Sequence, residues 1–265
     1  MTEPSAFFLP DGERFVPTAL TRGPWSAGHQ HGGPPAALMA RAVELAAGEP
    51  ESLQITRFTA DFLRPVPIEP LTVLVERVRD GRRARGYAVV LSAGNQAVVR
   101  ATVLVVRRER VEPPSMPVRA PLQPLPGEAT PFQFPFFRDP VGYHTAMEAR
   151  LARGTFGSGR AAAWMRQRVP LLLGETPSPA QRTLVVADSG SGVGAAIDPT
   201  RFIPFINADL TVSLHRLPDG EWVGLDAVTD LGPHGIGLAR SGLYDVRGPV
   251  GEGLQNLVVG SAGAR

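Results

Sequence analysis

The chain has 265 residues, of which 43% are apolar and 20% charged, a composition typical of a globular protein with one or two sizeable cores. Its formal charge is only +2, and its 27 basic residues, all arginines, are interspersed with acids, so the sequence lacks the basic stripe that nucleic-acid binding requires. The absence of cysteine excludes disulfides, thiolate metal sites and a cysteine nucleophile.

Residues 1–10 lack the charged and apolar regions of a secretory leader, and no apolar run reaches the ~18 residues of a membrane span. We therefore expect a cytoplasmic protein without a membrane span.

The first element in chain order is a helix predicted over 36–47. It follows His31-Gly32-Gly33-Pro34-Pro35, and glycines followed by prolines are favourable at a helix start. Only Arg41 and Glu44 are polar in 36–47, so we expect protein to surround this helix on most sides.

Three strands are predicted next, over 71–78, 87–92 and 97–106, because these segments are rich in valine and leucine. Turn residues separate them at Asp80-Gly81 and Gly94-Asn95, which indicates antiparallel hairpins.

The composition changes between residues 111 and 140, where nine prolines and little periodicity indicate an extended connector. A less regular second helix is predicted within 179–198. Four further strands, again separated by turn residues, are predicted over 206–214, 222–230, 237–244 and 250–259.

The two halves of the chain resemble one another at ordered positions. The matching segments are Phe62-Leu63-Arg64-Pro65 with Leu214-His215-Arg216-Leu217-Pro218, Gly86 with Gly237, and 101–106 with 254–259. Their offsets of 152, 151 and 153 residues indicate a duplicated unit of about half the chain.

A buried helix followed by a curved antiparallel sheet, occurring twice, is the organisation of a tandem or double hotdog fold in the α+β class. We predict an N-terminal hotdog over 1–110, a proline-rich linker over 111–140 and a C-terminal hotdog over 141–265.

Other motifs point away from several enzyme classes. The G-x-G-x-x-A pattern within 184–195 is typical of dinucleotide-binding units, but only β-hairpins follow it, so we interpret it as a glycine- and serine-rich turn that ends a helix. No G-x-S-x-G nucleophile elbow is present. His29 and His31 have no third ligand nearby in sequence, and we predict neither a metal site nor a cofactor.

The order of several short motifs resembles the TesB-like, type II acyl-CoA thioesterases over roughly residues 12 to 260. The motifs are 31–38, 62–65 and 80–82 in the first half, and Ala187-Asp188, Asn207-Ala208-Asp209, 215–218, Glu221-Trp222 and Gln255 in the second. The resemblance implies hydrolysis of fatty or related acyl-CoA to free acid and CoA.

In that family a carboxylate, a hydroxyl residue and a glutamine hold the attacking water, and these roles fall on Asp188, Asn207 and Gln255. Asn207 departs from the pattern, because an amide forms hydrogen bonds but cannot pass a proton as a hydroxyl does. A carboxylate desolvated in an apolar pocket suits general-base catalysis, because burial raises its pKa. The first copy offers only Glu44 as a counterpart, which we interpret as a solvated or paired helix end.

Substrate contacts are predicted in the first copy. Backbone N–H groups of Gly32 and Gly33 at a helix start could bind the oxyanion, although the sequence leaves open which helix start faces Asp188. Arg82, Arg83 and Arg85, which follow a hairpin turn, could contact the phosphates of CoA or form a solvated hairpin.

Structural interpretations stay open beside the catalytic ones. Asp188 could cap a glycine-rich turn, Gln255 could lie on the solvent face of an edge strand, and Asn207 could be a turn residue. The alternative function is a non-hydrolytic acyl-CoA or acyl-carrier binding protein. Hydratase or dehydratase chemistry would require an Asp/His pair along one strand–helix junction, and none is evident in the sequence. Free edge strands favour a homodimer or larger homo-oligomer.

Overall fold

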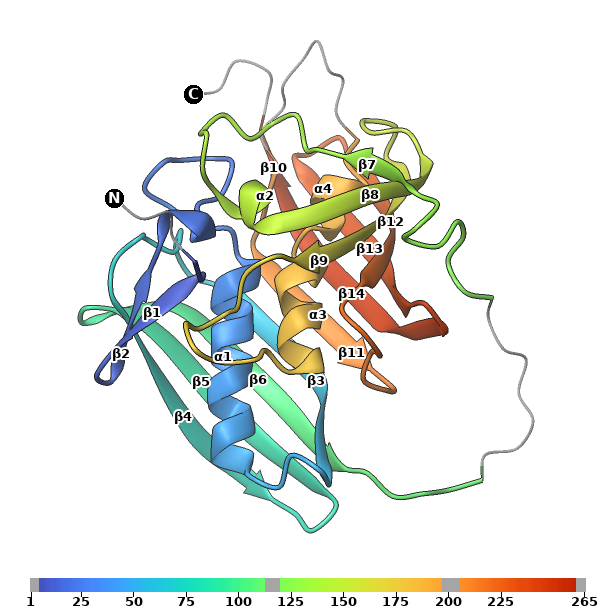
Figure 1. The fold of residues 1–265 in the computed structure, drawn as a ribbon. Coiled ribbons are helices and arrows are strands. Elements are labelled where there is room, and N and C mark those ends of the chain that lie inside the picture. The colour runs from blue at the N-terminus through green and yellow to red at the C-terminus, as the bar shows by residue number, and fades with distance from the viewer. Residues whose placement is uncertain (1–4, 113–119, 197–204, 261–265) are drawn as a thin grey trace.

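The computed structural model describes residues 5–112, 120–196 and 205–260. Within these residues, fourteen strands form one sheet in the order β1-β2-β4-β5-β6-β3-β11-β14-β13-β12-β9-β8-β7, with β10 paired to β14 (Figure 1). The first half contributes β1 (Phe8–Asp11), β2 (Arg14–Pro17), β3 (Leu53–Phe62), β4 (Leu71–Asp80), β5 (Ala84–Ala93) and β6 (Gln96–Arg107). The second half contributes β7 (Thr130–Phe132), β8 (Met147–Gly154), β9 (Arg160–Gln167), β10 (Phe205–Asn207), β11 (Asp209–Leu214), β12 (Val223–Leu231), β13 (Ile236–Asp245) and β14 (Gly248–Val259).

The two halves of the sheet join at the antiparallel pair β3–β11. Thr59 lies directly opposite Thr211 there, and the two hydroxyl oxygens are 3.3 Å apart. These residues are 152 positions apart in sequence, the same offset as in the predicted repeat. The duplicated units therefore meet at equivalent positions and form one continuous sheet.

Two helices occupy the centre of the molecule, α1 (Gly33–Ala47) and α3 (Pro179–Ala187), and lie side by side (Figure 1). Helix α1 packs against β3, β4, β5 and β6 of the first half, and α3 packs against β9 and β12 of the second. They run antiparallel: Gly33 at the start of α1 lies against Val185 near the end of α3, and Glu44 near the end of α1 is bonded to Ser178 before α3. The remaining helices are short: η1 (Ala19–Thr21), α2 (Tyr143–Ala146) and α4 (Gly190–Val193). No helix in the described ranges is both long and apolar enough to cross a membrane.

The predicted helix and hairpins of the first half are confirmed, with α1 beginning three residues earlier than expected, at Gly33. The second predicted helix is divided into α3 and α4, and its last two positions, 197 and 198, lie outside the described residues. The predicted strand over 206–214 is also divided, into β10 and β11. Strands β1, β2, β3, β7, β8 and β9 were not predicted.

The described part of the proline-rich segment packs against the second half of the sheet. Strand β7 pairs with β8, and the indole N–H of Trp164 donates to the carbonyl of Pro124 (2.8 Å). Leu122 and Ala129 are buried beside the same tryptophan. The segment is therefore partly integrated into the fold, and the division at 111–140 remains our proposal.

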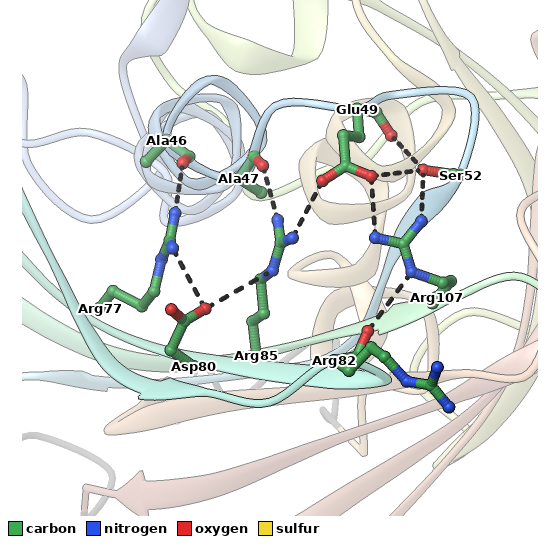
Figure 2. A network of polar contacts seen from close by, with 9 residues as sticks. All are labelled: Ala46, Ala47, Glu49, Ser52, Arg77, Asp80, Arg82, Arg85 and Arg107. Carbon is green, nitrogen blue, oxygen red and sulfur yellow. Dashed lines mark hydrogen bonds and ion pairs between the residues drawn. The ribbon is translucent and has the colours of Figure 1, made fainter.

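The C-terminal end of α1 is held by a cluster of arginines (Figure 2). Arg85 donates to the carbonyl of Ala47 (2.9 Å) and to the carboxylate of Glu49 (2.9 Å), which also accepts from Arg107 (2.8 Å). Cations at a helix C-terminus interact favourably with its unpaired carbonyls and dipole. Hydrogen bonds from Arg107, Arg85 and Ser52 lower the pKa of Glu49 to about 2.

This cluster predicts acid-dependent stability. Because the pKa of Glu49 is lower in the folded chain than its ordinary value, its contribution is complete above that ordinary value and is lost as pH falls toward about 2. We expect Glu49→Gln to lower the melting temperature near neutral pH, and the difference from the parent to shrink on acidification. Thermal unfolding followed by circular dichroism at several pH values tests this, with exposed Glu128→Gln as control. A constant difference at all pH values would contradict it.

The helix–helix contact gives a second prediction. A methyl group at Gly33 would collide with the carbonyl oxygen of Val185, whereas Gly127 has open space around it. We expect Gly33→Ala to lower the free energy of unfolding by about 1–3 kcal/mol, as overpacking does. Gly127→Ala is the matched control and should leave it nearly unchanged. Urea denaturation of both variants measures the effect. Equal free energies of unfolding in Gly33→Ala and Gly127→Ala would show that α1 and α3 can move apart without loss of stability.

Candidate active site

A cavity of about 540 Å³ opens at the N-terminal end of α1, beside the junction of α3 and α4. Much of its wall is aromatic: Trp25, Phe62, Phe134, Phe136, Phe137, Tyr143 and Phe205. The ring planes of Trp25 and Phe136 are nearly parallel at 6.1 Å, and Phe205 meets Trp25 edge-on at 5.4 Å. An apolar wall with a few polar groups is typical of a small-molecule site.

Asp188 lies at this cavity, at the C-cap of α3, with only 3% of its side chain exposed. Its position follows from the helix, which begins at the capping hydroxyl of Ser178, continues through Pro179 and ends at Ala187. The Oδ1 atom accepts hydrogen bonds from the Nδ2 of Asn207 (2.8 Å) and the Nε2 of Gln255 (3.3 Å). The structure thus brings together the three residues that the sequence singled out.

Gln255 comes from β14 and is buried, so its interpretation as a solvent-facing residue is wrong. Its Nε2 also donates to the backbone carbonyl of Asp188 (3.0 Å), and its Oε1 accepts from the backbone N–H of Ser191 (2.8 Å). A side chain at Gly190 would collide with Ser241 and crowd this amide. Gln255 therefore fixes the turn between α3 and α4 as well as the carboxylate.

Asn207 ends the short strand β10, where β10 gives way to β11. Its Nδ2 donates both to Asp188 and to the backbone carbonyl of Asp209 (3.0 Å). Asp209 in turn accepts from the side chain of Asn256 (2.7 Å), which ties the turn to β14. Both amide hydrogens of Asn207 are thus used within the protein, and one of them holds the carboxylate.

The glycines before α1 allow the carboxylate to approach the helix start. A Cβ atom at Gly32 would lie 2.9 Å from the Oδ2 of Asp188 and 2.7 Å from Phe62. The start of α1 therefore faces Asp188, which the sequence left open. A helix N-terminus favours negative charge, so it suits both a carboxylate and a developing oxyanion.

His31 and Tyr143 are part of the site and were missed in the sequence. The Nδ1 of His31 lies 3.1 Å from the Oδ2 of Asp188, and its ring stacks on Tyr143 with ring centroids 3.7 Å apart. An Asp/His pair is therefore present, although it does not lie along one strand–helix junction. It joins the start of α1 in the first repeat to the end of α3 in the second.

Burial controls the charges of both aromatic groups. It lowers the pKa of His31, and the charge of Asp188 partly opposes this, so the imidazole is neutral near neutral pH. Burial also raises the pKa of Tyr143, whose hydroxyl donates to the carbonyl of Val185 (2.9 Å) and contacts Ser189 (2.9 Å). Tyr143 is therefore a fixed, neutral support for the imidazole.

The predicted CoA-binding arginines lie at the other end of α1, about 22 Å away along a helix of this length. Arg85 donates to Ala47 and Glu49, and the carbonyl of Arg82 accepts from Arg107 (Figure 2). Arg83 pairs with Glu109 (3.2 Å). The structure does not bring them to the cavity, and their contact with CoA stays a prediction. The cavity wall instead includes Arg64, which is exposed.

No cluster of three or more histidine, aspartate or glutamate side chains that could hold a metal ion occurs in the described ranges.

Comparison with known proteins identifies the family. The model of the acyl-CoA thioesterase N-terminal domain matches residues 21–106, and that of the acyl-CoA thioesterase C-terminal domain matches residues 117–259. No curated protein matches the chain in sequence.

Solved structures share the fold along the whole chain. A hot dog fold protein of Alicyclobacillus acidocaldarius is similar with a TM-score of 0.73 at 19% identity, covering 96% of both chains. The tesB protein of Mycobacterium avium subspecies paratuberculosis gives 0.71 at 16%, also covering 96% of both. Acyl-CoA thioesterase II TesB2 of Mycobacterium marinum gives 0.66 at 15%, covering 96% of this chain and 95% of that one. These likenesses confirm the predicted double hotdog.

Because the two domain models follow one another along most of the chain, this protein belongs to the acyl-CoA thioesterase family and is a thioester hydrolase.

Proposed function

We propose that the protein hydrolyses fatty or related acyl-CoA thioesters with a water molecule that Asp188 activates. The observation that carries this proposal is the convergence of Asn207 and Gln255 on Asp188, which lines an apolar cavity. Two amide donors fix Oδ1, so Oδ2, which faces the start of α1, is the atom we assign as the base.

The reaction needs one proton transfer and one site of negative charge. As the water oxygen bonds to the thioester carbon, Asp188 takes its proton, and such positioned bases contribute about 10²- to 10⁴-fold to the rate. The carbonyl oxygen becomes negative, and the backbone N–H groups at the start of α1, including that of Gly33, are the donors we propose for it. Collapse of the intermediate then breaks the C–S bond and releases the acid and CoA.

The cavity supports an apolar acyl group. Its aromatic wall would bury an acyl chain, whereas a polar acid would leave its hydrogen-bonding groups without partners there. We further propose that Arg64 contacts a phosphate of CoA, because its guanidinium is exposed at the cavity and forms no hydrogen bond or ion pair with any described residue.

The Asp188–His31 contact raises the question of hydration or dehydration of the acyl chain, because that chemistry requires an Asp/His pair. That reaction adds or removes protons at two neighbouring substrate atoms. Asp188 and His31 are in direct contact at 3.1 Å and so share one proton position. This geometry favours the single proton transfer of hydrolysis.

The central prediction concerns Asp188→Asn. The variant keeps the shape of the side chain but cannot take a proton, so we expect kcat for thiol release to fall about 10²- to 10⁴-fold. Acyl-CoAs from butyryl to stearoyl are the substrates, and Asp230→Asn, on an exposed ion pair with Arg240, is the matched control.

Two outcomes would overturn this proposal. Equal rates in Asp188→Asn and the parent would remove Asp188 as the base. Tight acyl-CoA binding by calorimetry, without thiol release from any chain length, would instead identify a non-hydrolytic binding protein.

A second prediction concerns Asn207→Asp. The change places a second carboxylate 2.8 Å from Asp188, and like charges at that distance raise the pKa of the pair. We expect the acidic limb of the pH–rate profile to move up by more than about one pH unit, with lower activity near neutral pH. Asn95→Asp, in an exposed hairpin turn, is the control. An unshifted limb would show that Asn207 does not adjoin the catalytic base.

A further inference from the structure

The Nδ1 atom of His31 faces two groups with opposite requirements. The backbone N–H of Gly33 donates to it at 3.2 Å, which requires a lone pair on the nitrogen. The Oδ2 of Asp188 lies 3.1 Å from the same atom and, as a carboxylate, needs a proton there. One ring nitrogen cannot meet both requirements at once, so a single proton decides which contact is made.

The imidazole is held so that this choice cannot be avoided by rotation. Its plane lies within 1° of the ring of Tyr143, whose hydroxyl is fixed by Val185 and Ser189. Its side chain is only 12% exposed. The titratable and charged groups around it are Asp188 and Tyr143 in contact, with His29 and Arg64 along the cavity wall.

The imidazole is also able to receive a proton. Burial lowers the pKa of His31, so the ring is neutral at the start of the reaction. The adjacent carboxylate of Asp188 stabilises the imidazolium that would form.

We propose that His31 is a second proton acceptor of the site and that its protonation frees the Gly33 N–H for the oxyanion. This inference rests on the proposed hydrolysis by Asp188-activated water. It adds to that mechanism the destination of the proton and a reason for the timing of the oxyanion contact.

The steps balance as follows. The water O–H bond breaks as its oxygen bonds to the thioester carbon, and the proton passes to Oδ2 of Asp188 and on to Nδ1 of His31. Nδ1 then no longer accepts from Gly33, whose N–H turns to the oxyanion formed in the same step. When the C–S bond breaks, sulfur keeps the bonding electrons and receives the proton from the pair. The acid and the thiol leave, and His31 is neutral again.

Two substitutions at His31 separate a proton role from a packing role. His31→Phe keeps an aromatic ring over Tyr143, and His31→Gln keeps a hydrogen-bonding group near Asp188, but neither accepts a proton. We expect both to lower kcat for thiol release about 10- to 100-fold with KM within about threefold, and to change the pH–rate profile. His234→Gln, in an exposed turn that does not line the cavity, is the matched control. A parental kcat in His31→Gln would overturn the proposal.

A second measurement does not depend on turnover. The ring nitrogens of ¹⁵N-labelled histidine report the protonation of His31 by NMR during a pH titration, in the parent and in Asp188→Asn. Loss of the carboxylate charge should lower the pKa of His31 further. An identical titration in both proteins would overturn the proposal even if the enzyme is active. If the titration of His31 differs between the parent and Asp188→Asn but neither protein releases thiol, the proposed hydrolysis is contradicted. The proton position shared by His31 and Asp188 is supported by that result.

Discussion

The close packing of α1 against α3 is the contact on which the rest of the structure depends. It requires a glycine at position 33, because the Val185 carbonyl occupies the space of a side chain. Since the helices are antiparallel, the end of each one meets the start of the other. Helix starts carry partial positive charge, so this arrangement creates two places where a carboxylate is stabilised, and the chain fills both, with Asp188 and Glu44.

The two places have different surroundings. The carboxylate of Glu44 accepts from the hydroxyl of Ser178 (2.7 Å) and the amide of Gln181 (2.7 Å). Both of its oxygens are therefore hydrogen-bonded to side chains at the start of α3. Burial nevertheless raises the pKa of Glu44. Asp188 has its amide donors on Oδ1 and an imidazole beside Oδ2, at the edge of a cavity. The duplicated fold thus supplies two equivalent positions, and the side chains around them make one a structural contact and the other an acid–base site.

The sequence predicted the elements whose residues alternate or cluster clearly and missed those whose composition points elsewhere. Strand β9 contains a run of alanines buried on both faces, and such a run cannot be distinguished from a helix by periodicity. Strand β8 carries two arginines and a glutamate, and β3 mixes threonine, glutamine and charged residues with its apolar ones. These strands are specified by their pairing partners, because tertiary context overrides the weak local preference for strand.

The site was predictable to the extent that it depends on motif order. Asp188, Asn207 and Gln255 could be located because the second repeat contains all three, whereas the contact of His31 with Asp188 joins the two repeats across 157 positions and leaves no local pattern.

The proline-rich segment shows the same limit. Pro131 and Pro135 favour an extended backbone, which suits a linker. An extended segment can also direct its side chains into a cavity. Phe134, Phe136 and Phe137 do so, and the segment that composition marks as a connector therefore forms part of the wall that would contact the acyl group.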